Sequence, residues 1–271
     1  MSEVMRSDIL RELDVEELAN EFQNQKPFPS ICIDNFLHED FANEVADAYP
    51  TYEEAQEMGR GFNAVNERGK YQITDSQLFP EPIKRLHETL ASDEFLGTMS
   101  RMSGIDDLKA DEKMVGGGIH QTGPRGHLDV HVDFNYIVDR KLHRRLNILV
   151  FFNRDWKEEW GGKLELWDED VKVCHRSFSP IFNRCCIFQT SEISFHGVTA
   201  VKCPEDAARR SFAAYYYTQE KDDAFMENVH STVFRARPDE HLKRNVLMPL
   251  EQFGRMLTKS KNALKRIIKP R

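Results

Sequence analysis

Between Met114 and Thr218 the chain is a succession of short β-type segments, and this stretch constrains the fold more than any other feature. Gly, Pro and Asn residues separate the segments, which include VGGGIHQT, HLDVHVDFNYIV, RLNILVFFN, GKLELWD, CCIFQT, ISFHGVTAV and RRSFAAYYYT. Many short strands with turn signals between them are typical of a sandwich or a closed barrel of the jelly-roll kind. We therefore predict an α+β fold with a jelly-roll core over residues 113–220.

The residues before this core are expected to be mainly helical. The spacing of apolar residues predicts four helices, over residues 8–24, 39–48, 81–91 and 93–102. Asp14 and Glu17 have capping-box spacing before the first apolar turn. Residues 30–33 alternate as a short strand. Residues 51–80 are expected to be irregular and to cover the pocket as a loop.

No linker rich in Gly, Pro or Ser marks the change of texture near residue 113. The sequence therefore predicts a single domain over residues 1–271. Its expected parts are a helical flank (1–112), the β core (113–220) and a C-terminal extension with a basic tail (221–271).

Composition places the chain among ordinary globular proteins, with 40% hydrophobic and 30% charged residues. No apolar run reaches the roughly 18 residues that a membrane span needs, and the acidic N-terminus lacks the apolar region of a signal peptide. A cytoplasmic location is the expectation. The five cysteines are an odd number without a CxxC pair, so we expect reduced thiols rather than a disulfide framework.

The charge is unevenly distributed along the chain. The first 251 residues carry 30 basic and 45 acidic side chains, which argues against a nucleic-acid partner. The remaining residues carry seven basic side chains and no acidic one. This tail is expected either to pack against the acidic body or to touch an anionic surface.

A candidate metal site begins in the segment HLDVHVDF. Side chains two residues apart on a strand point the same way, so His131 and Asp133 share a face and lie about 7 Å apart along the strand. His196, in another β-type segment, is a candidate third ligand. Two histidines and one carboxylate on one face of a metal leave positions open and favour iron(II). A lone His-x-Asp is a weak signal, because His127-x-Asp129 has the same spacing on the same strand face.

A candidate anion site follows in the segment RRSFAAYYYT. Alternation places Arg209 and Ser211 on one face and Arg210 on the other. A guanidinium beside a hydroxyl suits a carboxylate, through a bidentate charge-assisted pair and one further donor. A structural alternative is that the arginines neutralise Glu205 and Asp206.

Several of these segments together resemble the prolyl 4-hydroxylase-like branch of the 2-oxoglutarate/iron(II) oxygenases. The likeness covers most of residues 28–218 and rests on PSICIDNFL, GGGIHQTGPRGHLDVH, HVDFN, RRLNILVFFNRDWKEEWGGKLELWD, FHGV and RRSFAAYYYT. It implies a double-stranded β-helix core flanked by N-terminal helices, iron bound by His131, Asp133 and His196, and 2-oxoglutarate anchored by Arg209 with Ser211. The Asp-Phe-Asn that follows in the family pattern selects His131 over His127.

The resemblance implies a dioxygenase that uses iron(II), 2-oxoglutarate and O2, with ascorbate as a candidate stimulant, to hydroxylate an unactivated C–H bond. A small molecule and a peptidyl, for example prolyl, substrate both stay open, as does a homodimer. Collagen-type prolyl hydroxylases have Lys where this chain has Arg209, which puts equivalence of substrate in doubt. Asp133 disfavours the halogenase variant. The alternatives are an inactive jelly-roll binding module and a cupin-like metalloenzyme that does not use 2-oxoglutarate.

Softer expectations concern the walls of the barrel. Asn147 shares an alternating strand face and is a candidate hydrogen-bond donor to 2-oxoglutarate. His120 and Gln121 are candidate pocket residues, although a structural hydrogen bond is an equal expectation for each. Gly161-Gly162 predicts a tight turn. The basic cluster at residues 140–145 is expected to be a solvated loop that covers the pocket, and attraction of an anionic substrate is the alternative.

Overall fold

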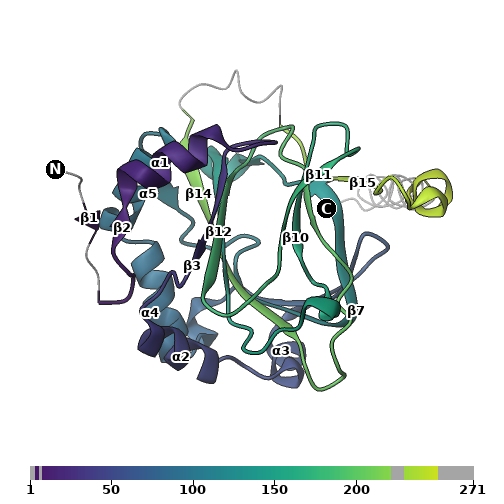
Figure 1. Cartoon of the computed structure of the whole chain (residues 1–271), viewed down its shortest axis with the longest axis horizontal. Helices are drawn as coiled ribbons and strands as arrows, with labels where there is room; N and C mark the ends of the chain where they lie inside the picture. Colours follow the sequence, from purple (N-terminus) through teal and green to yellow (C-terminus); the bar gives the residue numbers. More distant parts are fainter. Residues whose placement is uncertain (1–3, 6–7, 221–228, 250–271) are drawn as a thin grey trace, which may run out of the picture.

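The computed structural model describes residues 4–5, 8–220 and 229–249, and all structural statements below concern these residues (Figure 1). The helices are α1 (Val15–Asn24), α2 (Glu39–Asp47), α3 (Tyr52–Met58), α4 (Glu81–Leu90) and α5 (Asp93–Ser103). The first strands are β1 (Val4–Met5), β2 (Leu13–Asp14), β3 (Ser30–Asp34), β4 (Arg60–Asn63), β5 (Glu67–Ile73) and β6 (Lys109–Ala110). The others are β7 (Gly118–Val132), β8 (Tyr136–Ile137), β9 (Leu142–Phe151), β10 (Leu164–Trp167), β11 (Cys174–Phe178), β12 (Arg184–Gln189), β13 (His196–Val198), β14 (Arg209–Gln219) and β15 (Val233–Arg235).

The first helix, α1, begins at Val15 and is therefore shorter than the helix predicted over residues 8–24. The Asp14 carboxylate accepts a hydrogen bond from the backbone N–H of Glu17 at 3.1 Å and caps the helix. Leu10 forms an isolated β-bridge with Leu37, so the residues before the cap are extended. The predicted capping residue is therefore confirmed, and the helix begins after it rather than at residue 8.

The prediction that residues 51–80 are irregular is wrong. Thr51 and Glu54 form a complete capping box that begins α3, with hydrogen bonds of 2.8 and 3.2 Å. The strands β4 and β5 then pair as an antiparallel hairpin, and β5 also pairs with β7. This hairpin therefore belongs to the sheet that carries the candidate site.

Thirteen strands form one continuous sheet, whose main path runs β11-β10-β13-β7-β14-β9-β12-β3. The 15-residue strand β7 connects two layers: its first half pairs with β14, and its second half pairs with β13 and β15. The path curls back on itself, so β10 and β11 face β12 and β3 across the interior (Figure 1). The result is a nearly closed antiparallel barrel, and the α+β jelly-roll prediction is confirmed.

The two apolar clusters that bear most on the site lie on opposite faces of the sheet. The larger one fills the space between the sheet and the N-terminal helices, of which α1, α2, α4 and α5 lie along the β3–β12–β14 side (Figure 1). It includes Phe22, Phe95, Ile148 and Phe212, all fully buried. A smaller cluster lies on the opposite face of the sheet, inside the barrel. The helices therefore stabilise the outer face of the sheet and leave its inner face to build a cavity.

None of the described helices is both long and apolar enough to span a bilayer. The basic residues of the tail lie outside the described part of the chain. The C-terminal extension nevertheless contributes β15 to the sheet, which the sequence did not predict.

Candidate metal centre

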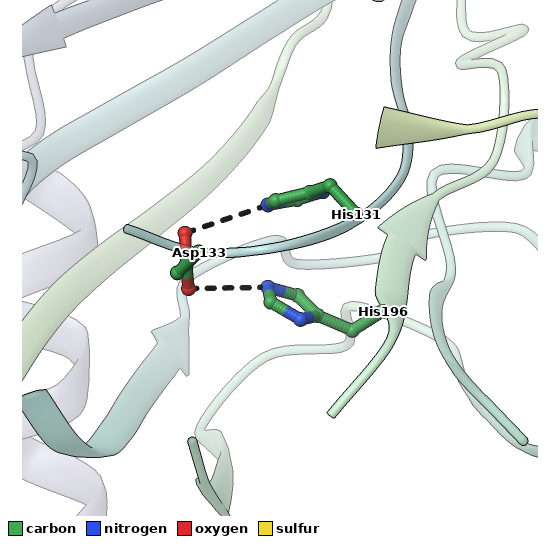
Figure 2. Close-up of side chains that lie close together, drawn as sticks. All are labelled: His131, Asp133 and His196. Atoms are coloured by element: carbon green, nitrogen blue, oxygen red, sulfur yellow. Dashed lines mark ion pairs between the residues drawn. The ribbon is translucent and has the colours of Figure 1, made fainter. Parts of the chain in front are cut away.

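His131, Asp133 and His196 converge on one point inside the barrel (Figure 2). His131 is the penultimate residue of β7 and lies opposite His196, the first residue of β13, in the antiparallel register. One carboxylate oxygen of Asp133 is 3.5 Å from Nε2 of His131, and the other is 3.5 Å from Nε2 of His196. One ligand atom from each residue lies within 4.8 Å of the others. This donor set fits a single divalent cation between the three side chains.

Backbone carbonyls fix the protonation of both imidazoles. Nδ1 of His131 is 2.8 Å from the carbonyl oxygen of Asp129, and Nδ1 of His196 is 3.0 Å from that of Ser194. A carbonyl only accepts, so each Nδ1 carries the proton and each Nε2 presents its lone pair toward Asp133. Burial, reinforced by the neighbouring His131, lowers the pKa of His196 to about 3. His196 is therefore neutral, and in both rings the Nδ1 contacts leave Nε2 as the atom that can bind a metal.

Asp133 is held by a buried cation. Nη2 of Arg144 lies 3.0 Å from Oδ2 of Asp133, and Nδ2 of Asn147 donates to the same oxygen at 2.8 Å. Nε of Arg144 donates to Oδ1 of Asn147 at 2.8 Å, which closes a three-residue network. Burial alone would raise the pKa of Asp133, but the Arg144 guanidinium holds it well below its usual range. Asp133 is therefore ionised, and its Oδ1 is not used by this network.

The prediction of a solvated loop at residues 140–145 is wrong for Arg144, because only 2% of the surface of this residue is exposed. The register between β9 and β14 shifts after Tyr216: Leu146 faces Tyr216, whereas Arg144 faces Tyr217. One residue, Arg145, is skipped, as in a β-bulge. The bulge interrupts the alternation and lets Arg144 reach the same network as Asn147. Strict alternation would have placed Arg145 there.

A cavity of about 390 Å³ adjoins the three side chains, and Arg209 lines it. Nε of Arg209 donates to the carbonyl oxygen of Gly162 at 2.7 Å, and Nη1 donates to the hydroxyl of Ser211 at 3.3 Å. Gly162 has a φ of +67°, and a Cβ there would lie 3.0 Å from Cδ of Arg209. The tight turn predicted at Gly161-Gly162 is present and leaves room for the arginine.

Nη2 of Arg209 is buried and has no hydrogen-bond partner in the described structure. Burial lowers the pKa of the guanidinium to about 10, so it stays charged at neutral pH. Glu205 instead pairs with Arg125 at 3.1 Å. An unpaired, buried cationic donor on a cavity wall is costly unless an anion binds there. The residues therefore fit the far carboxylate of a small organic diacid.

The softer candidates separate. His120 and Asn147 both line the cavity. Gln121 is fully buried and its amide donates to the carbonyl oxygen of Pro50 at 2.7 Å, so its role is structural. Asp129 belongs to a second group of charges near the first: its Oδ1 lies 3.7 Å from His127 and 2.6 Å from Nζ of Lys243.

Two further walls of the cavity come from segments whose pairing with β7 the sequence did not predict. One is the β4–β5 hairpin, which contributes Arg60, Phe62 and Lys70. The other is the C-terminal strap, residues 229–249. Its strand β15 pairs with β7, and the ring of Phe234 lies 5.3 Å from that of His131. No local sequence signal connects these segments to the site, because their pairing with β7 is long-range.

Comparison with known proteins adds an independent observation. The model of the 2OG-Fe(II) oxygenase superfamily matches residues 117–217, the stretch that contains the three converging side chains and Arg209. The match thus covers the candidate metal centre and the candidate anion site. The chain is also 31% identical over 78 residues to a stretch of the prolyl 3-hydroxylase OGFOD1 from Mus musculus. That alignment covers 27% of this chain and 14% of the mouse protein.

Solved structures share the oxygenase fold. A prolyl hydroxylase from Trichoplax adhaerens, in complex with a fragment of the hypoxia inducible factor, aligns with a TM-score of 0.54 and 21% identity over 75% of this chain and 90% of that one. A prolyl 4-hydroxylase from Pseudomonas putida gives 0.53 and 14% over 75% and 99%. The carbocyclase SnoK of nogalamycin biosynthesis gives 0.52 and 14% over 84% and 89%. At these identities the similarity shows the double-stranded β-helix fold alone.

Proposed function

We propose that this chain is an iron(II)- and 2-oxoglutarate-dependent dioxygenase that hydroxylates an unactivated C–H bond. In this proposal His131, Asp133 and His196 hold iron, and Arg209 anchors the far carboxylate of 2-oxoglutarate with Ser211 behind its guanidinium. The observation that carries the proposal is that a His-Asp-His cluster and a buried arginine with an unused N–H line one cavity. The whole chain, residues 1–271, is proposed to act as one oxygenase domain.

The residues of the chain have separable tasks. Iron(II), 2-oxoglutarate and O2 supply the oxidising chemistry that breaks the C–H bond. The two backbone carbonyls accept hydrogen bonds from Nδ1 and so orient each imidazole with Nε2 toward the metal position. Arg144 and Asn147 occupy Oδ2 of Asp133 and leave Oδ1 for the metal. Arg209 orients the diacid. Asn147 lines the cavity and donates one amide N–H to Asp133, and its second amide hydrogen is the proposed contact with 2-oxoglutarate.

A prolyl residue of a polypeptide is the first substrate that we propose. The mouse relative is named a prolyl 3-hydroxylase, and two of the structures with this fold are prolyl hydroxylases. A small molecule is the second candidate, because the fold also occurs in the carbocyclase SnoK. The side chains of the β4–β5 hairpin and of the C-terminal strap line the cavity beside the metal ligands. We propose that these side chains select between a prolyl peptide and a small molecule.

The test is the conversion of 2-oxoglutarate to succinate with iron(II) and ascorbate, in the presence of prolyl peptides and small-molecule extracts. We expect succinate and a product 16 Da heavier than its substrate, both lost in His131→Ala. Absence of succinate with every substrate, despite bound iron, would favour the binding-module alternative.

Arg209→Met distinguishes the cupin-like alternative, with Arg210→Met as the matched control on the opposite face of the same strand. A charge-assisted hydrogen bond contributes about 1.5–3 kcal/mol, so the loss of the anchor should raise the 2-oxoglutarate KM by roughly 10- to 150-fold. Arg210→Met should leave it unchanged. An enzyme that is equally active in both variants does not use 2-oxoglutarate through this arginine.

A further inference from the structure

Two cysteines that are 154 positions apart in the sequence face each other across neighbouring strands. Cys32 of β3 is the direct partner of Cys186 of β12 in the antiparallel register. The Sγ of Cys186 donates a hydrogen bond to the Sγ of Cys32 at 3.5 Å. The other three thiols are differently placed: Cys174 and Cys203 donate to backbone carbonyls, and Cys185 belongs to the core cluster on the outer face of the sheet.

The backbone geometry of this pair already suits a disulfide. Directly opposed residues of antiparallel strands have Cα atoms about 4.5–5.5 Å apart, which lies within the range of about 4.4–6.8 Å that disulfides require. The sulfurs must approach by only about 1.5 Å to reach a bond length near 2.05 Å. Side-chain rotation is sufficient for this approach, and the strands need not separate.

The two thiols differ in the way that a reactive pair requires. Cys32 is half-buried on β3, the last strand of the sheet path, whereas Cys186 is 1% exposed. The hydrogen bond from Cys186, together with the positive charges of Arg184 and Arg176, lowers the pKa of Cys32 against the opposing effects of burial and Asp34. Burial raises the pKa of Cys186. Cys32 is thus the accessible thiol with the greater thiolate character, and Cys186 is the sheltered partner.

We propose that Cys32 and Cys186 are a peroxide-sensitive thiol pair that oxidises to a cross-strand disulfide. The Cys32 thiolate attacks hydrogen peroxide, the O–O bond breaks, hydroxide leaves, and Cys32 becomes a sulfenic acid. The Cys186 sulfur then attacks the Cys32 sulfur, the S–O bond breaks, and the hydroxyl leaves as water with the Cys186 proton. The two thiols together lose two protons and two electrons, which reduce one peroxide to two waters.

The disulfide would lie in the inner wall of the barrel. Cys186 belongs to the inner apolar cluster, together with Phe151 and Leu164, and Cys32 packs against that cluster. The guanidinium of Arg209 lies 4.9 Å from the centre of the Phe151 ring, and Leu164 lines the cavity. Oxidation would therefore crosslink the wall that adjoins the candidate anion anchor. The thiol chemistry itself requires neither iron nor 2-oxoglutarate, so its outcome is independent of the proposed function.

The experiment treats the full chain, as purified, with hydrogen peroxide, then alkylates free thiols and digests with trypsin without reduction. The two thiols fall in different tryptic peptides, residues 12–60 and 185–202. We expect these peptides to be joined, with a mass 2 Da below their sum, in monomeric protein. The Tm should rise by roughly 5 °C and return after treatment with dithiothreitol, because the crosslink restricts the unfolded chain.

Variants identify the sulfurs, because the second peptide contains two adjacent cysteines. Cys185→Ser is the matched control and should keep the linked peptide, whereas Cys32→Ser and Cys186→Ser should each abolish it together with the rise in Tm. Cys32→Ser changes a half-buried position, so it provides a folded variant if the buried Cys186→Ser is unstable. Linkage through Cys185, linkage only between separate molecules, or oxidation of Cys32 to sulfinic acid without a crosslink would each overturn the proposal.

Discussion

Arg144→Met tests whether a buried cation holds the carboxylate of the candidate metal centre. The substitution removes the guanidinium 3.0 Å from Asp133 and the hydrogen bond to Asn147. It keeps an unbranched apolar side chain against the ring of Tyr215, which lies 3.5 Å from the Arg144 guanidinium carbon. Arg145→Met is the matched control, because Arg145 is the adjacent, half-buried residue that the β-bulge leaves outside the network.

The magnitude follows from distance and burial. At 3.0 Å and an effective dielectric constant of about 20, the gross attraction between two unit charges is about 5.5 kcal/mol. The side chains of Arg144 and Asp133 are only 2% and 15% exposed, so solvent screens the pair weakly and cannot replace the lost partner. Removal of one partner from a buried pair typically costs 3–5 kcal/mol. We expect the free energy of unfolding to fall by about 3 kcal/mol and the Tm by roughly 6–12 °C.

Urea unfolding of metal-free protein, with a chelator present, measures this loss without interference from bound iron. The control Arg145→Met should change the free energy by no more than about 0.5 kcal/mol. In the background of Asp133→Asn, which removes the charge that Arg144 neutralises, Arg144→Met should cost less, with a coupling energy of about 2 kcal/mol. Additive effects of the two substitutions, or equal losses in Arg144→Met and Arg145→Met, would refute the reasoning.

Three further predictions concern the surroundings of the same centre. Burial lowers the pKa of His196 to about 3, so between about pH 3 and 6.5 this residue binds a proton only in the unfolded chain. The free energy of unfolding of metal-free protein should therefore fall as the pH falls through that window. His196→Gln should reduce the pH dependence of urea unfolding by about one proton. Gly162→Ala should destabilise the fold by about 1 kcal/mol or more and raise the 2-oxoglutarate KM, since the position has a positive φ and the new Cβ would press on Arg209; an unchanged KM would contradict this. Lys243→Met removes the 2.6 Å contact to the fully buried Asp129 and should make thermolysin cleave the C-terminal strap faster, while cleavage elsewhere stays constant.

Strand alternation could predict the pairs of side chains that no register shift separates. His131 and Asp133 are two residues apart, and Arg209 and Ser211 likewise, so each pair shares a face as expected. Arg144 was missed because the register shift next to it reverses the alternation on which the inference depended. A bulge depends on how two strands pair, and no residue in the segment LHRRLN signals it locally.

The fold was predictable at the level of architecture, because many short strands with turns leave few alternatives to a jelly roll. Long-range partners were not predictable. The β4–β5 hairpin lacks a two-residue Asn-Gly or Asp-Gly turn, and was therefore interpreted as irregular. Phe234 reaches His131 only through the pairing of β15 with β7, about a hundred residues away. The same holds for Cys32 and Cys186, whose separate segments carry no sign of contact.

The long strand β7 brings together several segments that form the candidate metal centre. Its second half is paired on one side with β13, which brings His196, and on the other with β15, which brings Phe234. His131 is opposite both partners, so its ring is fixed between a second candidate ligand and an aromatic cover. The ion pair between Lys243 of the strap and the carboxylate of Asp129 in turn holds the strap in place. The backbone carbonyl oxygen of Asp129 accepts a hydrogen bond from Nδ1 of His131. A displacement of the strap would therefore act on the metal centre through Asp129 and His131, and not only through exposure of the cavity.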